Sequence, residues 1–178
     1  MAVVTFTIRD LESEDFETLW RIDQDCFPAG IAYSRAELKT YMRRGGAFTL
    51  VAVDEGIRAG ADGDAAKSEK NVAAATSSPR SIAGFIVAEA DTRASGHIVT
   101  IDVVKTARRS RVGSLLLQAA EDQLQAKGCR SVELETAVDN LSALSFYKRH
   151  SYSVVRTFPR YYSNGVDALV LEKPLVHK

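Results

Sequence analysis

Apolar side chains recur with two periods along the chain, and the change from one period to the other separates strands from helices. Alternating or continuous apolar runs rich in β-branched residues predict strands over residues 3–9, 47–55, 82–91, 96–104, 130–138, 152–162 and 167–175. Apolar residues spaced three and four apart predict helices within residues 12–27, 35–44, 112–127 and 141–150. The expected order is therefore β-α-α-β-β-β-α-β-α-β-β.

Residues that stabilise helix ends stand where the periodic pattern begins and stops. Ser34 and Glu37 have the spacing of a capping box at the start of the second helix. Asn140 has the chemistry of an N-cap for the last helix. Lys127 and Gly128 form a typical helix C-terminus. These signals support the predicted helix limits independently of hydrophobicity.

The long helix after residue 106 lies between two apolar strands, which is the pattern of a β-α-β unit. Such a unit joins two parallel strands by a right-handed crossover. The strands on either side follow one another through short turns, so they are expected to pair antiparallel. We therefore predict an α/β fold with a mixed, mostly antiparallel sheet, a central parallel β-α-β unit and helices on both faces, in one domain over residues 1–178.

Residues 55–81 depart from this pattern. They are rich in Ala, Gly, Ser and charged residues and have almost no large apolar side chain. Such a segment buries too little surface to offset its ordering entropy. We interpret it as a flexible loop inserted between two strands, with a partner-docking role as the alternative.

Composition narrows the class of protein. The 178 residues carry 23 Lys and Arg against 23 Asp and Glu, so the formal net charge is zero, which disfavours binding to nucleic acid by charge. No apolar run is long enough to predict a membrane span, and the first residues do not resemble a secretory signal. The two cysteines, Cys26 and Cys129, are too few for a disulfide framework or a zinc site. We expect a cytoplasmic protein without a metal.

A basic turn before the long helix is the strongest candidate for a binding site. Arg108, Arg109 and Arg111 precede the helix, and Gly113 and Ser114 lie at its start. A helix N-terminus offers unpaired N–H groups and a partial positive charge, small residues permit close approach, and arginines add countercharge. These features predict a pyrophosphate site, the alternative being a solvated basic turn. A P-loop is excluded because the chain has no GxxxxGK[ST] motif.

The same residues resemble a known superfamily. Arg108–Gly113 is similar to the Q/R-x-x-G-x-G/A motif of the GCN5-related N-acetyltransferases (GNAT). The C-terminal segment 140–175, with Asn140, Tyr147, Tyr161-Tyr162 and Asp167-Ala168, resembles RimI-like and eukaryotic protein N-terminal acetyltransferases. The resemblance covers nearly the whole chain outside residues 55–81. It implies the GNAT fold and transfer of an acetyl group from acetyl-CoA to the N-terminal α-amine of a protein or peptide, as in ribosomal-protein-alanine acetyltransferases.

Two positions depart from the family pattern. Arg111 stands where the first Gly of the motif is usual, and Ser151 stands where a Gly commonly precedes the last aromatic residue of its segment, here Tyr152. A Cβ at Arg111 either obstructs a phosphate or forces a strained φ, whereas its guanidinium can add a phosphate contact.

The resemblance also implies the residues that hold acetyl-CoA. The pantetheine arm would pair with the backbone of the strand that ends near residue 104, and the pyrophosphate would occupy the basic turn. The implied cofactor-binding residues are Ile101, Asp102, Val103, Arg108, Arg109, Ser110, Arg111, Val112, Gly113, Ser114 and Asn140.

Two residues are candidates for acid–base chemistry. Alternation places Glu133 and Glu135 on one face of a strand that the topology makes internal, so these acids are expected to face a cleft. The resemblance implies that Glu135 is the general base, the alternative being a structural role. It also implies that Tyr147 protonates the leaving thiolate, which suits a phenol that stays protonated at neutral pH. A buried core tyrosine is the alternative.

Other side chains are expected near the acceptor. His97 aligns with positions that some relatives use near the amine, and Tyr33, Tyr161 and Tyr162 are candidates for loops over the acceptor peptide. The alternatives are a partly buried histidine and ordinary aromatic packing. Two further functions remain open at this point: acetylation of a small-molecule amine or lysine, and a non-catalytic acyl-CoA-binding domain.

Overall fold

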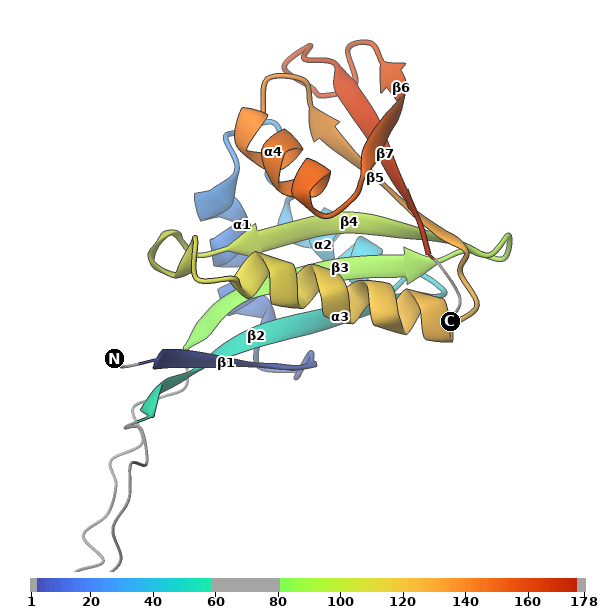
Figure 1. The fold of residues 1–178 in the computed structure, drawn as a ribbon. Helices are drawn as coiled ribbons and strands as arrows, with labels where there is room; N and C mark the ends of the chain where they lie inside the picture. Colours follow the sequence, from blue (N-terminus) through green and yellow to red (C-terminus); the bar gives the residue numbers. More distant parts are fainter. Residues whose placement is uncertain (1–2, 59–80, 176–178) are drawn as a thin grey trace, which may run out of the picture.

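The computed structural model describes residues 3–58 and 81–175 (Figure 1). Its elements follow the predicted order, with a short 3₁₀ turn added before the long helix. They are β1 (Val3–Asp10), α1 (Phe16–Cys26), α2 (Arg35–Met42), β2 (Ala47–Arg58), β3 (Ile82–Ala90), β4 (Ser95–Val103), the 3₁₀ turn (Lys105–Ala107), α3 (Val112–Ala126), β5 (Ser131–Ala137), α4 (Leu141–Arg149), β6 (Ser153–Phe158) and β7 (Ala168–Pro174).

The strands form one seven-stranded sheet in the order β1-β2-β3-β4-β5-β7-β6. Every neighbouring pair is antiparallel except β4 and β5, which are parallel and joined by α3. The predicted mixed sheet with one central β-α-β unit is therefore confirmed.

Helices cover both faces of this sheet (Figure 1). The apolar residues of α3, among them Leu116 and Leu124, are fully buried in one cluster that also contains Tyr147 of α4. On the opposite face, Leu19 of α1 and Leu38 of α2 are fully buried against β2 and β3. Two apolar cores, one on each face, hold the central strands in place.

A buried polar group connects the long helix to the C-terminal half of the sheet. Glu121 of α3 is buried, and its carboxylate accepts hydrogen bonds from the Tyr152 hydroxyl at 2.9 Å and from Lys173 Nζ of β7 at 2.5 Å. Both carboxylate oxygens are thereby paired, which satisfies the rule for a buried charge.

The predicted helix caps are present. The Ser34 and Glu37 side chains each bond the other's backbone N–H, and Asn140 Oδ1 accepts from the Ala143 N–H at 3.1 Å. The second helix ends at Met42, two residues before the expected limit.

Two strand limits differ by more than one residue from the sequence prediction. Strand β2 continues to Arg58, so residues 55–58 belong to a strand and not to the expected loop, because they extend the pairing with β1. The rest of the expected loop, residues 59–80, lies outside the described residues. Strand β6 ends at Phe158 instead of Tyr162, since Pro159 lacks the N–H that a continuing ladder needs.

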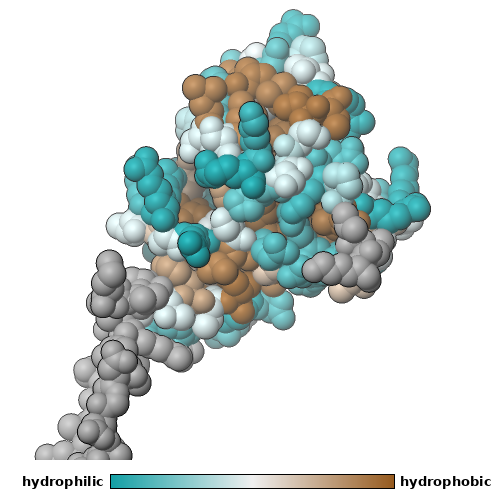
Figure 2. All heavy atoms as spheres, viewed as in Figure 1, coloured by the Kyte–Doolittle hydropathy of each residue, from teal (hydrophilic) through white to brown (hydrophobic). Residues whose placement is uncertain are grey.

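Exposed apolar side chains gather at the end of the molecule that carries α4 and the C-terminal strands (Figure 2). All six residues of the edge strand β6 are exposed. The exposed large apolar residues of these two elements are Leu141, Val154, Val155 and Phe158. In the described part of the chain, no helix is long and apolar enough to cross a bilayer.

Candidate active site

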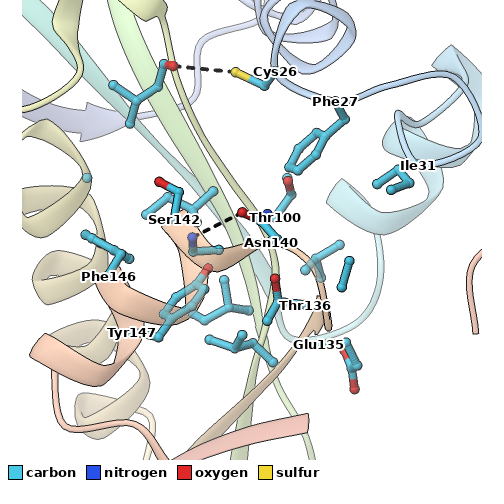
Figure 3. A pocket seen from close by; sticks show the side chains of 18 of the residues that line it. Cys26, Phe27, Ile31, Thr100, Glu135, Thr136, Asn140, Ser142, Phe146 and Tyr147 are labelled. Carbon is cyan, nitrogen blue, oxygen red and sulfur yellow. Dashed lines mark hydrogen bonds between the residues drawn. The ribbon is translucent and has the colours of Figure 1, made fainter. Parts of the chain in front are cut away.

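The two parallel strands at the centre of the sheet part after a short common stretch. Strand β4 pairs with β5 only over Ser95–Ile98, opposite Ser131–Leu134. Beyond this point β4 stays with β3 and β5 stays with β7. The space between the parted strands is a cavity of about 930 Å³, whose lining includes Val99, Thr136 and Asn140 (Figure 3). This volume lies in the range typical of small-molecule sites.

A bulge in β4 shapes the wall of this cavity. Thr100 pairs with Val87 and Ile98 pairs with Ala88, so Val99 has no partner residue on β3. The carbonyl oxygen of Val99 accepts a hydrogen bond from the Tyr33 hydroxyl at 3.4 Å. A bulge interrupts the ladder and re-aims the side chains after it. After the bulge, Thr100 Oγ1 donates a hydrogen bond to Asp102 Oδ2 at 3.1 Å.

The basic turn contributes to the lining of the cavity. Arg108, Arg109 and Arg111 all line it, together with Gly113 and Ser114 at the start of α3. Arg109 and Arg111 have left-handed φ values of 64° and 70°. The residue before the helix, Arg111, makes no side-chain cap, so the first N–H groups of α3 are not capped by that side chain. Uncapped N–H groups and three guanidinium groups form a site suited to a phosphate.

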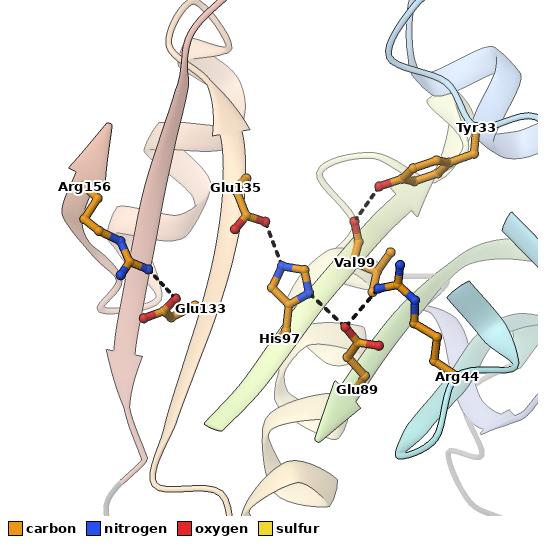
Figure 4. A network of polar contacts seen from close by, with 8 residues as sticks. All are labelled: Tyr33, Arg44, Glu89, His97, Val99, Glu133, Glu135 and Arg156. Atoms are coloured by element: carbon orange, nitrogen blue, oxygen red, sulfur yellow. Dashed lines mark hydrogen bonds and ion pairs between the residues drawn. The ribbon is translucent and has the colours of Figure 1, made fainter. Parts of the chain in front are cut away.

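Glu135 of β5 and His97 of β4 face each other where the two strands begin to part (Figure 4). Glu135 Oε2 lies 2.7 Å from His97 Nε2. Burial by itself lowers the pKa of His97, but the hydrogen bond and negative charge of Glu135, with the charge of Glu89, outweigh it and raise that pKa above the ordinary value. The pair is therefore a site where a proton can be accepted and held.

Tyr147 extends from α4 into the cavity beside Asn140 (Figure 3). Its ring packs edge-on against Phe146 and Tyr152, with centroids 5.2 and 5.5 Å away. Burial is the main cause of a raised pKa for its phenol, and the negative charge of Asp102 adds to it. The hydroxyl is consequently protonated at neutral pH and can act as a proton donor.

Four further tyrosines line the cavity. Tyr33 and Tyr41 pack with ring centroids 5.0 Å apart, and Tyr161 and Tyr162 with centroids 5.1 Å apart. Burial raises the pKa of Tyr162 to about 12, so this hydroxyl also stays neutral. All four residues line the cavity.

The loops that carry these tyrosines are joined by a hydrogen bond. Ser163 Oγ donates to the Gly30 carbonyl oxygen at 2.7 Å. A Cβ on Gly30, whose φ is +90°, would lie 2.7 Å from the same Ser163 oxygen. Only glycine therefore permits this contact.

The structure brings most of the sequence-predicted residues to the cavity. Those that line it are Tyr33, His97, Ile101, Val103, Arg108, Arg109, Arg111, Gly113, Ser114, Glu135, Asn140, Tyr147, Tyr161 and Tyr162. Asp102, Ser110 and Val112 do not. The Asp102 side chain is buried beside Thr100, Ser110 Oγ bonds the Ala107 carbonyl, and Val112 is buried in the core.

Sequence reasoning missed two partners of these residues. Glu89 of β3 lies opposite His97 in the register of the sheet, and the His150 ring contacts Ser114 Oγ. The alternation of β3 places Glu89 on one of two faces but does not show what it meets. No sequence pattern around His150 predicted its contact with Ser114, because that contact depends on how α4 packs against α3.

The sequence of this chain is similar to those of known acetyltransferases. Residues 16–152 match the sequence model of the Acetyltransferase (GNAT) family. N-alpha-acetyltransferase 30 from Schizosaccharomyces pombe is 38% identical over 73 residues, which are 41% of this chain and 49% of that protein. The chain spans about half the length of the curated relatives it matches.

Solved structures share the fold over nearly the whole chain. Ard1 from Thermoplasma volcanium is 25% identical, with a TM-score of 0.74 over 97% of this chain and 99% of that one. NAA60 from Arabidopsis thaliana, solved with acetyl-CoA, is 21% identical, with a TM-score of 0.73 over 96% of this chain and 99% of that one. The expected fold is thereby confirmed.

Proposed function

Because the chain belongs to the acetyltransferase (GNAT) family, we propose that it transfers an acetyl group from acetyl-CoA to the N-terminal α-amine of a protein or peptide. The observation that carries this proposal is the layout of one cavity. Its lining combines the arginine turn, four tyrosines, and Glu135, His97 and Tyr147.

The cavity matches the parts of acetyl-CoA. Arg108, Arg109 and Arg111 surround the start of α3, where the pyrophosphate would receive N–H and guanidinium donors. The parted strands β4 and β5 leave backbone groups facing the cavity, and an extended pantetheine arm can pair with such groups at Ile101 and Val103. The thioester would then lie near Glu135 and Tyr147.

The residues support direct transfer without a metal ion. Glu135, directly or through water, takes a proton from the ammonium of the acceptor, and the neutral amine attacks the thioester carbon. The bulge at Val99, where the ladder to β3 is interrupted, is the place in the wall suited to N–H donation toward the oxyanion. Attack leaves two hydrogens on a positively charged nitrogen. As the tetrahedral intermediate collapses, the C–S bond breaks and Tyr147 gives its proton to the thiolate. The nitrogen loses its surplus proton, which restores the Tyr147 phenol through water and leaves the neutral amide.

Proton chemistry favours an α-amine over lysine as the acceptor. With reference pKa values of about 7.8 and 10.4, roughly one α-amine in eight is neutral at pH 7, against about one lysine in 2,500. The Ser163–Gly30 hydrogen bond also joins two loops that carry tyrosines of the cavity lining, and we expect these loops to admit a chain terminus more readily than a side chain in the middle of a peptide. A RimI-like specificity and a cytoplasmic location belong to the same proposal, and the free thiols of Cys26 and Cys129 are compatible with a reducing compartment.

Two matched peptides test the acceptor. One has a free N-terminus and no lysine; the other has a blocked N-terminus and one lysine. We expect acetylation of the first and at least tenfold slower reaction of the second, with mass spectrometry locating the acetyl group. Preferential acetylation of lysine would contradict the choice of acceptor. Tight binding of acetyl-CoA in calorimetry without turnover on any peptide would instead favour a non-catalytic acyl-CoA-binding domain.

A further inference from the structure

The imidazole ring of His150 connects the end of α4 to the start of α3. His150 is the residue that caps the C-terminus of α4, and Ser114 lies in the first turn of α3. The Nε2 atom of His150 lies 2.9 Å from Ser114 Oγ, and the Nδ1 atom lies 2.8 Å from the Phe146 carbonyl oxygen. The imidazole also packs against the Phe146 ring, with centroids 4.4 Å apart. These three contacts hold the ring in one position.

Ser114 is the link between this ring and the cavity. Ser114 lines the cavity together with Arg109 and Arg111 of the basic turn, whereas His150 is not among the lining residues. The first N–H groups of α3, which the Arg111 side chain does not cap, lie at the same place. A ligand bound there would therefore meet the Ser114 hydroxyl directly and His150 only through that hydroxyl.

In its neutral form, His150 turns the Ser114 hydroxyl away from an anion. The Phe146 carbonyl oxygen only accepts hydrogen bonds, so Nδ1 of the ring carries the hydrogen. Nε2 is then an acceptor and takes the hydroxyl hydrogen of Ser114. The Ser114 oxygen consequently presents lone pairs to the cavity, and lone pairs repel the oxygens of a phosphate.

Protonation of His150 reverses the direction of this hydrogen bond. In the imidazolium both ring nitrogens carry hydrogen, so Nδ1–H still donates to the Phe146 carbonyl while Nε2–H donates to Ser114 Oγ. The hydroxyl hydrogen of Ser114 is then free to donate to a phosphate oxygen, with a positive charge directly behind it. The cationic ring thus creates a strong donor where the start of α3 already favours an anion.

We propose that His150 is a positioning residue for the pyrophosphate of acetyl-CoA, an inference that rests on the proposed function. His150 sets the direction of the Ser114 hydroxyl and touches neither acetyl-CoA nor the acceptor. Because the imidazolium form offers the additional donor, acetyl-CoA binds that form more tightly and takes up a proton from solvent as it binds.

The groups around His150 keep a constant charge over the pH range in which an imidazole titrates. The charged residues closest to His150 and Ser114 along the chain are all basic: Arg108, Arg109, Arg111, Lys148 and Arg149. Their side chains stay protonated near neutral pH. Burial raises the pKa of the neighbouring Tyr147, so its phenol stays neutral. Within residues 3–58 and 81–175, the His150 ring forms no ion pair.

The first test measures cofactor affinity by calorimetry at pH 6 and pH 8. The probe is 3′-dephospho-acetyl-CoA, since it lacks the phosphate monoester whose second pKa of about 6 would itself titrate. We expect the wild-type protein to bind this probe roughly fivefold more tightly at pH 6 than at pH 8. His150→Phe keeps an aromatic ring against Phe146 but cannot titrate, so its affinity should change by less than about twofold.

The two affinity curves are expected to cross. His150→Phe should bind the probe more weakly than wild type at pH 6, where the positive charge is lost. At pH 8 it should bind equally well or more tightly, because no neutral imidazole takes the Ser114 hydrogen. The control is His97→Gln, which removes the histidine that lines the cavity and should keep the wild-type pH dependence. Binding that His150→Phe weakens by the same factor at both pH values would mean a merely structural role and would overturn the proposal.

The second test separates the Ser114 hydroxyl from the charge of the ring. Ser114→Ala should reduce the pH dependence to about twofold, because the imidazolium then acts only by its distant charge. Full wild-type dependence in this variant would contradict the role of the hydroxyl. NMR of labelled histidine in the wild-type protein needs no variant, and we expect the probe to move the titration midpoint of His150 to higher pH. Binding without such a shift overturns the role of His150 alone, whereas a wild-type protein that binds no acetyl-CoA at any pH overturns the proposed function as well.

Discussion

His150, the residue that follows α4, holds the hydroxyl of Ser114 at the start of α3. His150 Nε2 lies 2.9 Å from Ser114 Oγ, and its Nδ1 lies 2.8 Å from the Phe146 carbonyl oxygen. Because a carbonyl only accepts, Nδ1 carries hydrogen, and the neutral ring accepts the Ser114 O–H at Nε2. The C-terminal helix is thus tied to the turn that we assign to the pyrophosphate.

A double-mutant cycle measures the coupling free energy between Ser114 and His150. With Ser114→Ala, His150→Phe and the double variant, we expect the free energies of unfolding to show a coupling of about 1 kcal/mol, as for a part-buried hydrogen bond. The exposed Gln118–Asp122 side-chain bond, 2.9 Å long and within α3, is the control and should show coupling near zero. Equal couplings for the two pairs would contradict the assigned hydrogen bond.

Removal of the proposed base or acid should affect turnover far more than cofactor binding. Glu135→Gln and Tyr147→Phe are each expected to lower kcat by roughly 10²- to 10⁴-fold, because each removes a group that moves a proton. Calorimetry should find acetyl-CoA affinity nearly unchanged in both variants. Near-normal turnover of both from pH 6 to 9 would mean that these residues are structural.

Arg111 combines a strained backbone with a useful charge, and two substitutions separate these effects. Its φ of 70° is unfavourable for a residue with a Cβ, so Arg111→Gly is expected to stabilise the fold by up to about 1 kcal/mol. Arg111→Gln keeps the strain and removes the charge. Both variants should bind acetyl-CoA roughly threefold more weakly and with a shallower dependence on salt. Unchanged affinity and salt dependence, even when Arg108→Ala and Arg109→Ala are added, would argue against the pyrophosphate site.

Asp102 should make the protein less stable as pH rises. Burial raises its pKa well above the ordinary value, and its Oδ1 has no hydrogen-bond partner among residues 3–58 and 81–175. The folded state therefore binds the proton more tightly than the unfolded state, so stability falls as pH increases from about 4 through the folded pKa. Asp102→Asn is expected to stabilise the protein at pH 8 by about 1–3 kcal/mol. The gain should vanish below pH 4.

Urea unfolding at pH 8 and pH 4 measures this difference. The exposed Asp122→Asn variant is the control and should change stability little at either pH. A destabilised Asp102→Asn protein at pH 8 would show that the carboxylate is held by a favourable interaction.

Much of the fold could be predicted because its elements follow local rules. The capping box at Ser34 and the N-cap at Asn140 depend on residues three positions apart, and the periods of 2 and 3.6 depend on the immediate sequence. The parallel pairing of β4 and β5 followed from the helix between them, because a helical crossover returns the chain to the same end of the sheet.

The candidate site was predicted less completely, because parts of it depend on register and packing. The bulge at Val99 is a property of the β3–β4 pairing, and no residue type marks it in the sequence. The contact of Glu89 with His97 requires both strands in one register. Likewise, Asp102 belongs to a family-like segment, yet its side chain is buried away from the cavity.

The short pairing between β4 and β5 affects how fast the amide protons of the sheet exchange with solvent. Amide protons at the centre of a sheet usually exchange slowest with solvent. Here β4 beyond Ile98 and β5 beyond Leu134 no longer pair with each other, so their facing amides should exchange like those of an outer edge until a bound ligand covers them. We then expect the two halves of the sheet to unfold locally as separate units. The buried ion pair between Glu121 and Lys173 is a side-chain contact that connects them.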